Sequence, residues 1–160
     1  MKTEKDKRFA RLAGKKILII EDDFFVRDIY QKKLGESGFS VESAADGLEG
    51  LERLRSHVPD LIILDIFMPY VDGRDVLREI KGNEEWKHIP VILLTNFSAS
   101  EGVKDGFGLG AAEYLIKSHF TPSEVLEKVC SVFEKAEKDG ILGTSGKEQE
   151  TRNKEEKEPE

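Results

Sequence analysis

The chain has 160 residues, of which 38% are hydrophobic and 36% charged, and its formal net charge at pH 7 is −7. This length suits one domain with polar tails, and an acidic chain gains nothing from the phosphate backbone of a nucleic acid, so direct nucleic-acid binding is disfavoured. The sequence lacks the run of about 18 apolar residues that a membrane helix needs and the apolar stretch of a signal peptide, so we expect no membrane insertion.

Both ends of the chain are polar and offer little to bury. Residues 1–14 form an arm with more Lys and Arg than Asp and Glu, and residues 139–160 carry mixed charges. Such segments do not offset the entropy lost on ordering. We therefore expect a disordered basic arm over 1–14, one ordered domain over 15–138 and a charged, disordered tail over 139–160.

Short apolar runs within the ordered domain predict five strands, because each run is too short for a helix and suits a strand buried on both faces. The runs are Ile17–Ile20, a weaker one around Phe39 and Val41, Leu61–Leu64, Val91–Leu94 and Tyr114–Ile116.

Helical patterns alternate with these runs. The apolar stripes comprise Phe25, Ile29 and Leu34; Leu48, Leu51 and Leu54; Val76, Leu77 and Ile80; and Val125, Leu126, Val129 and Phe133. One more helix is expected over roughly Ser98 to Gly108. Five strands alternating with five helices predict an α/β fold whose parallel sheet is covered on both faces.

Capping signals support several of these helix starts. Thr121 to Glu124 has a capping residue, a proline at the first helical position and a glutamate at the third. The spacing recurs from Asp46 to Glu49 and from Ser98 to Glu101, with a weaker version from Asp72 to Asp75.

Cys130 lies on the apolar stripe of the last helix and is predicted to be buried core. It is the single cysteine, so no intrachain disulfide can form. This favours a reducing, cytoplasmic compartment.

Four strands end in polar side chains of a functional type. The first run is followed by Glu21, Asp22 and Asp23, the third by Asp65, and the last two end at Thr95 and Lys117. Ligands bind beyond the carboxyl ends of the strands in such sheets. Singly, each residue reads as a helix cap or a surface charge, but together they predict one site.

The chemistry of this set points to phosphoryl transfer. Clustered carboxylates repel one another, and a hard cation relieves that repulsion, with oxygen ligands favouring Mg²⁺ or Mn²⁺ over zinc. Asp65 can act as a nucleophile and form an aspartyl phosphate. The hydroxyl of Thr95 and the ammonium of Lys117 would then hold other phosphoryl oxygens.

Four blocks of the sequence resemble those of the bacterial two-component receiver domain, of the chemotaxis-regulator type: KILIIEDD, LIILDIFMPYVDG, IPVILLTN and GAAEYLIKS. The resemblance covers about residues 15–138. It implies a flavodoxin-like, doubly wound sheet of five parallel strands in the order 2-1-3-4-5 with five helices. It also implies a switch phosphorylated by a histidine kinase or a histidine phosphotransfer protein.

The resemblance further assigns roles to individual residues. Glu21 and Asp22 become the acidic metal pair. Asp65 becomes both the phosphoryl acceptor and the third metal carboxylate, and Phe67 supplies a backbone carbonyl to the metal. Thr95 and Lys117 contact the phosphoryl group, and Tyr114 shares the switch role with Thr95. Asp23 is interpreted instead as the cap of the first helix.

The sequence departs from the family pattern at two positions. Ser118 follows Lys117 where the family has a cis-proline, so the bond is either trans with a different loop or a cis bond that costs about 3–4 kcal/mol. Asn96 stands where the family has a small residue, and its side chain narrows the entrance to Asp65.

Two other functions fit the sequence less well. A haloacid-dehalogenase-type hydrolase, which also forms an aspartyl phosphate, has a second acid two residues after the nucleophile, where this chain has Phe67. A flavodoxin-like cofactor binder needs a Ser-, Thr- and Gly-rich phosphate loop, where this chain has Glu21, Asp22 and Asp23. Nothing after Asp139 is large enough for an output domain, so we expect output through a protein partner; whether the chain is a piece of a longer regulator stays open.

Overall fold

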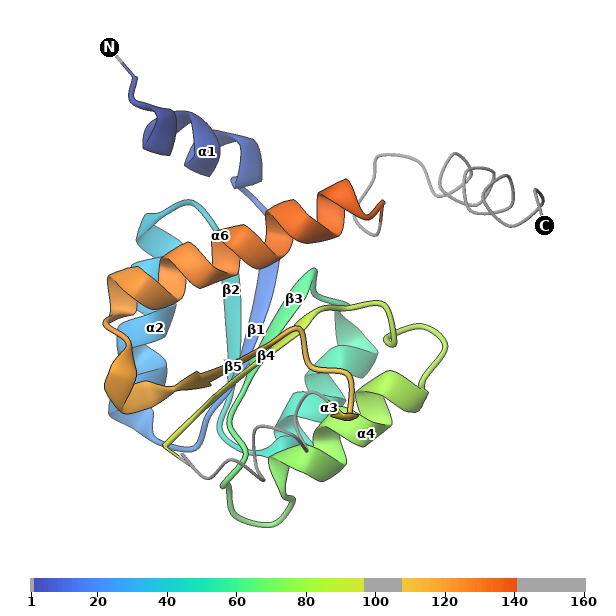
Figure 1. Cartoon of the computed structure of the whole chain (residues 1–160). Coiled ribbons are helices and arrows are strands. Elements are labelled where there is room, and N and C mark those ends of the chain that lie inside the picture. Colours follow the sequence, from blue (N-terminus) through green and yellow to red (C-terminus); the bar gives the residue numbers. More distant parts are fainter. Residues whose placement is uncertain (1, 97–107, 141–160) are drawn as a thin grey trace, which may run out of the picture.

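Five parallel strands form one sheet at the centre of the protein, in the order β2-β1-β3-β4-β5. The computed structural model describes residues 2–96 and 108–140 (Figure 1). The strands are β1 (Lys16–Ile20), β2 (Ser40–Ala44), β3 (Leu61–Leu64), β4 (Val91–Thr95) and β5 (Glu113–Ile116). The doubly wound α/β fold and its strand order are therefore confirmed.

The described residues form five α-helices and one short 3₁₀ helix. They are α1 (Glu4–Leu12), α2 (Phe24–Glu36), α3 (Gly47–Ser56), α4 (Gly73–Gly82), α6 (Pro122–Lys138) and the 3₁₀ helix η1 (Lys117–His119). The helix expected over roughly Ser98 to Gly108 falls almost entirely on residues 97–107, outside the described part of the chain. Residues 141–160 of the tail predicted over 139–160 also lie outside it. No helix within the described ranges is both long and apolar enough to cross a membrane.

Side chains alternate between the two faces of the sheet and build two core layers. On β1, Ile17 and Ile19 pack into the core that Leu34 of α2 and Phe133 of α6 complete. Leu18 and Ile20 point the other way, into the core beneath α3 and α4. This alternation follows from the two-residue period of a strand, and it leaves the central strands buried on both faces (Figure 1).

The inward face of α2 differs from the predicted stripe. Phe25 and Ile29 are exposed, whereas Tyr30 and Leu34 are buried and Val26 packs against the same core. The core-facing positions Val26, Tyr30 and Leu34 are spaced by four residues, so the predicted stripe is confirmed at Leu34 and wrong at Phe25 and Ile29. Exposed Leu48 at the start of α3 is a similar error, since the core-facing leucines of that helix are Leu51 and Leu54.

Most of the predicted helix starts are confirmed by side-chain capping bonds. The carboxylate of Asp23 accepts from the amides of Phe25 and Val26, and Asp46 and Asp72 cap α3 and α4 in the same way. Thr121 forms a reciprocal capping box with Glu124. These bonds satisfy amide groups that a helix otherwise leaves without partners.

The basic arm was expected to be disordered, and this expectation is wrong for most of it. Residues Glu4–Leu12 form α1, which begins with a capping box between Thr3 and Asp6. Leu12 is fully buried, and Arg8 forms ion pairs with carboxylates of α6. Composition alone could not reveal this helix, because its order comes from contacts with residues more than one hundred positions away in the sequence.

Gly73 allows α4 to begin directly against the backbone that follows β3. A Cβ atom on Gly73 would lie 2.7 Å from the Cα of Ile66 and still closer to the carbonyl oxygen of Asp65. The Gly73 amide donates to the Ile66 carbonyl at 2.7 Å. Because the crowding atoms belong to the backbone, no side-chain movement could relieve it.

We predict that Gly73→Ala lowers the free energy of unfolding by about 1–3 kcal/mol, the usual cost of overpacking. Gly82→Ala at the other end of α4 is the matched control, because a Cβ there would meet nothing within 4 Å. It should be neutral or stabilise by about 0.4–1 kcal/mol. Urea unfolding of both variants checks this, and equal stability of the two would contradict the proposed crowding.

Candidate functional site

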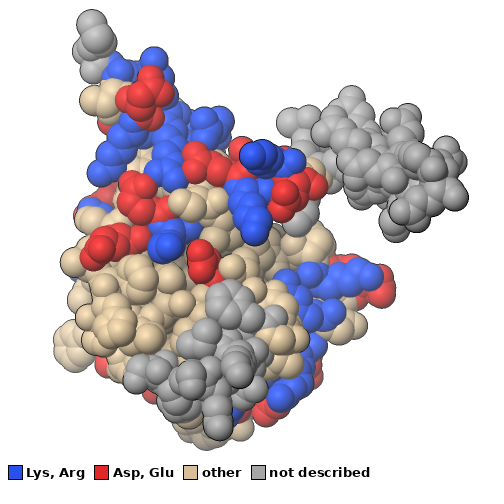
Figure 2. Space-filling model, in the orientation of Figure 1, with Lys and Arg blue, Asp and Glu red and all other residues tan. Residues whose placement is uncertain are grey.

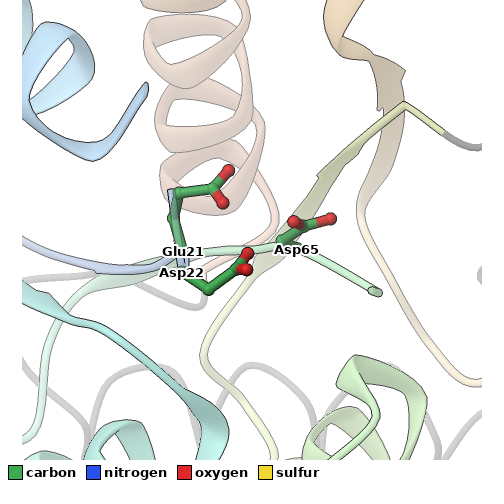
Figure 3. Close-up of side chains that lie close together, drawn as sticks. All are labelled: Glu21, Asp22 and Asp65. Atoms are coloured by element: carbon green, nitrogen blue, oxygen red, sulfur yellow. The ribbon is translucent and has the colours of Figure 1, made fainter. Parts of the chain in front are cut away.

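The carboxyl ends of β1 and β3 bring three carboxylates together. Glu21 and Asp22 follow β1 and Asp65 follows β3, and one carboxylate oxygen from each lies within 4.8 Å of the others. Figure 3 shows the three side chains close together, with those of Glu21 and Asp22 extending toward Asp65. Glu21 is 4% exposed and Asp65 6%, whereas Asp22 is open to solvent. The three residues therefore lie together at one edge of the sheet, as the sequence predicts.

Several hydrogen bonds hold Glu21 in place. Its amide donates to the Ala44 carbonyl at 3.1 Å, which continues the β1–β2 pairing past the strand end. Its carboxylate accepts from the Asp23 amide at 3.0 Å. Arg27, one turn into α2, donates to the Glu21 carbonyl at 2.7 Å. The loop that carries Glu21 and Asp22 is thus held by α2 as well as by the sheet.

Asp65 is fixed by its own backbone and by the loop that follows it. Its amide donates to the Ile20 carbonyl at 3.0 Å, next to Glu21. The chain then leaves the sheet through Ile66, which is buried, and Phe67, whose side chain is half exposed. The contact between Ile66 and Gly73 closes this loop beside Asp65.

Lys117 connects the two buried carboxylates. Its Nζ lies 3.2 Å from an Oδ atom of Asp65 and forms a second ion pair with Glu21. Burial alone would lower the pKa of Lys117, but the hydrogen bond to Glu21 and the charge of Asp65 outweigh it, so the pKa is raised. Lys117 is therefore protonated and positively charged at the edge of the sheet.

Glu21 has an unusual ionisation. Burial raises its pKa to about 7, even though the hydrogen bond from Lys117 and that from the Asp23 amide act to lower it. Removing a carboxylate from water disfavours the charged form, and the neighbouring charge of Asp65 adds to that effect. Glu21 is therefore protonated more readily than an ordinary glutamate, even with an ammonium group beside it.

Thr95 lies on β4, next to β3, and Tyr114 lies on β5, the edge strand beyond β4. Thr95 closes β4 and is 1% exposed, and it pairs in register with Ile116, the residue before Lys117. Tyr114 pairs with Leu93 and packs, partly buried, against the core beneath α3 and α4. All four predicted strand ends thus meet at one edge of the sheet.

The bond after Lys117 is trans, since the described residues contain no cis peptide bond. The chain continues as η1, which ends at His119. Of the two alternatives left by Ser118, the structure has the trans bond with a different loop.

Sequence reasoning missed two residues that position the site. Arg27 bonds the backbone of Glu21, and Gly73 lets the loop after Asp65 close. An arginine one turn beyond a helix cap is a weak signal for the first, since such a side chain can reach back toward the helix start. The close approach at Gly73 leaves no signal in a single sequence.

The donor set suits a hard divalent cation. All the side-chain groups are carboxylate oxygens, two of them buried, and Mg²⁺ characteristically uses one or two carboxylates together with waters. Among the described residues, these three are the group of acidic or histidine side chains placed to hold a metal. The residues present therefore fit the metal site that the sequence predicts.

The comparisons with known proteins all indicate the same family. The model of the response regulator receiver domain matches residues 17–130. The chain is 36% identical over 123 residues to a probable transcriptional regulator of Porphyridium aerugineum, covering 77% of this chain and 50% of that protein. It is 38% identical over 115 residues to the response regulator MprA of Mycobacterium tuberculosis, covering 71% and 48%. The chain thus spans about half the length of these curated relatives.

Solved structures agree with this result. The chemotaxis protein CheY4 of Vibrio cholerae superposes with a TM-score of 0.71 at 30% identity, over 75% of this chain and 99% of that chain. A CheY-like receiver domain protein from Methanospirillum hungatei gives a TM-score of 0.74 at 28% identity, over 79% and 99%. None of these matches supports the haloacid-dehalogenase alternative. The chain belongs to the response regulator receiver domains, the phosphorylation-dependent signalling switches of two-component systems.

Proposed function

We propose that this chain accepts a phosphoryl group on Asp65 from a histidine kinase or a histidine phosphotransfer protein. The observation that carries the proposal is the sharing of one ammonium, Lys117, between Asp65 and Glu21. A nucleophilic carboxylate needs a nearby cation to accept the charge of the incoming group. Lys117 is already placed beside it, at 3.2 Å.

The transfer uses a small number of groups. An Oδ atom of Asp65 forms a bond to phosphorus while the bond from phosphorus to the donor's imidazole nitrogen breaks, and that electron pair stays on the imidazole. Lys117 then pairs with a phosphoryl oxygen, and the hydroxyl of Thr95 donates to another. The protein contributes position and charge, which is most of what phosphoryl transfer requires.

Glu21, Asp22 and Asp65 would hold Mg²⁺, or Mn²⁺, with the backbone carbonyl of Phe67 as a further ligand. Their spacing and their oxygen-only chemistry support this assignment. A cation there supplies positive charge beside the phosphoryl oxygens. Asp22, the exposed member of the three, leaves the site open toward solvent and toward a donor.

The consequence of phosphorylation is a changed surface for a protein partner. Thr95 and Tyr114 lie on neighbouring strands, so a movement of the Thr95 hydroxyl toward the phosphoryl group alters the packing around Tyr114. In this proposal the domain works on itself, by gaining and losing its phosphoryl group, and not on a metabolic substrate. Its free, buried cysteine supports a cytoplasmic setting.

We propose that output passes through protein contacts and not through direct binding of nucleic acid by this domain. The chain carries a net charge of −7, which disfavours contact with a phosphate backbone. Relatives that are named transcriptional regulators are about twice as long as the region they share with this chain.

Asp65→Asn should abolish phosphorylation, because an amide cannot form the acyl phosphate. The protein is incubated with Mg²⁺ and a small acyl or amido phosphate, and intact mass spectrometry reports the gain of one phosphoryl group. Asp28→Asn on α2, where the carboxylate pairs with Lys32, is the matched control and should be modified like the wild type. Phosphorylation of Asp65→Asn at the wild-type rate would refute the proposed acceptor.

Metal binding should strengthen as pH rises from 6 to 8. The pKa of Glu21 is about 7 in the metal-free protein, so below that pH the cation must displace a proton, and affinity falls by up to about tenfold per pH unit. Mg²⁺ titrations followed by the backbone amide signals of Glu21 and Asp22 measure this.

Glu21→Gln is the control for that titration. It should bind Mg²⁺ more weakly and with a flatter pH profile, because the group that titrates near neutrality is gone. An equally steep profile in this variant would assign the titration to another residue.

A further inference from the structure

Helix α1 is an addition to the receiver fold. The family match begins at residue 17, after the end of α1 at Leu12. Solved receiver domains are covered almost completely, to 99% of their length, by only 75–79% of this chain. The contacts of α1 therefore belong to this chain and not to the common fold.

Two arginines attach α1 to α6. Arg8 donates through Nε and Nη2 to both carboxylate oxygens of Glu134, at 3.0 and 2.7 Å. Its Nη1 reaches Glu127 at 2.5 Å, and Arg11 donates to Glu134 at 2.6 Å. The bidentate pairing of Arg8 is the strong form of this interaction, and its side chain is only 22% exposed.

These contacts lie across one face of α6. Glu127, Ser131 and Glu134 are spaced by three or four residues and therefore share a face, and Arg8 also approaches the Ser131 hydroxyl at 3.4 Å. Cys130, adjacent to Ser131, is fully buried. Figure 2 shows mainly Lys and Arg side chains over α1, and Asp and Glu side chains interspersed with Lys over α6.

A joint separates α1 from the sheet. Gly14 has φ +84°, a conformation that side-chain-bearing residues rarely adopt, and its amide donates to the Gly38 carbonyl at 2.8 Å. The sheet begins at Lys16. The backbone is thus pinned to the domain at Gly14, and α1 lies entirely on the far side of that point.

We propose that the acidic face of α6 is a docking surface for a basic amphipathic helix, and that α1 of this same chain is its built-in occupant. The arginines of α1 are complementary in charge to the glutamates of α6 that they contact. Phe9 and Leu12, on the apolar side of α1, pack against the core. α1 is a hinged cover that swings about Gly14 without unfolding the receiver domain. A second helix reaches this face of α6 only when α1 has left it.

The single cysteine offers a direct test on the full-length chain. Cys130 belongs to the buried cluster that includes Leu12 and against which Phe9 packs, so in this proposal its alkylation by a small thiol reagent reports departure of α1. Arg8→Ala should accelerate alkylation by roughly 5–30-fold. Lys7→Ala is the matched control, because Lys7 pairs within α1 with Glu4 at 3.5 Å, and it should react at the wild-type rate. Equal rates for the two variants would overturn the proposal.

Salt and a second probe separate opening of the cover from unfolding. High ionic strength should accelerate alkylation of the wild type but not of Arg8→Ala, because it screens partly exposed ion pairs. Trp86, the single tryptophan, is buried in the core on the other face of the sheet. Its fluorescence should stay native while Cys130 reacts. Loss of Trp86 signal in step with alkylation would make Arg8 a general stability residue and refute the cover.

A peptide with the sequence of residues 2–14 tests the docking surface itself. Added to Arg8→Ala, it should slow Cys130 alkylation, and the same peptide with both arginines replaced by glutamate should not. Equal behaviour of the two peptides would show that α6 does not select a basic helix. None of these measurements depends on Asp65, so failure here and failure of phosphorylation are distinguishable.

Discussion

One ammonium group shared by two buried carboxylates is the interaction on which the site depends. Glu21 and Asp65 end neighbouring strands, and the pairing of those strands leaves them no freedom to separate. Burial makes their charges costly, and Lys117 is the cation between them. The attraction between Lys117 and the two carboxylates holds the site together. In our proposed function an incoming phosphoryl group competes for Lys117, and the domain changes because Lys117 cannot pair equally with both carboxylates afterwards.

The rest of the fold makes this arrangement possible. Parallel strands place their carboxyl ends at one edge of the sheet, and the two layers of helices exclude solvent from the central strands. The loops that carry the acidic residues are short and braced, by Arg27 on one side and by the tight approach of Gly73 on the other. Rigid bracing keeps the carboxylates close in spite of their repulsion, which is what a metal and phosphoryl site requires. In our further proposal, movement takes place at Gly14, away from these loops.

Much of this could be predicted from the sequence because the signals were local. Four buried apolar runs ended in polar groups, and parallel topology alone sends those groups to one edge. Helix caps such as Asp23 and Thr121 were equally legible. The predictions were wrong where contacts between residues far apart in the sequence determine the structure. α1 is ordered by its pairing with α6, and the phase of α2 is set by packing against the sheet, which the exposed Phe25 shows.

The most direct test of the central claim is the pKa of the Glu21 carboxyl group, measured by carbon NMR in the metal-free wild type and in Lys117→Met. The account predicts a value of about 7 in the wild type and a higher one in the variant, because the variant loses the attraction of the ammonium while burial and the charge of Asp65 remain. A wild-type value near that of an ordinary glutamate, or one that Lys117→Met leaves unchanged, would contradict the shared ammonium as the basis of this site.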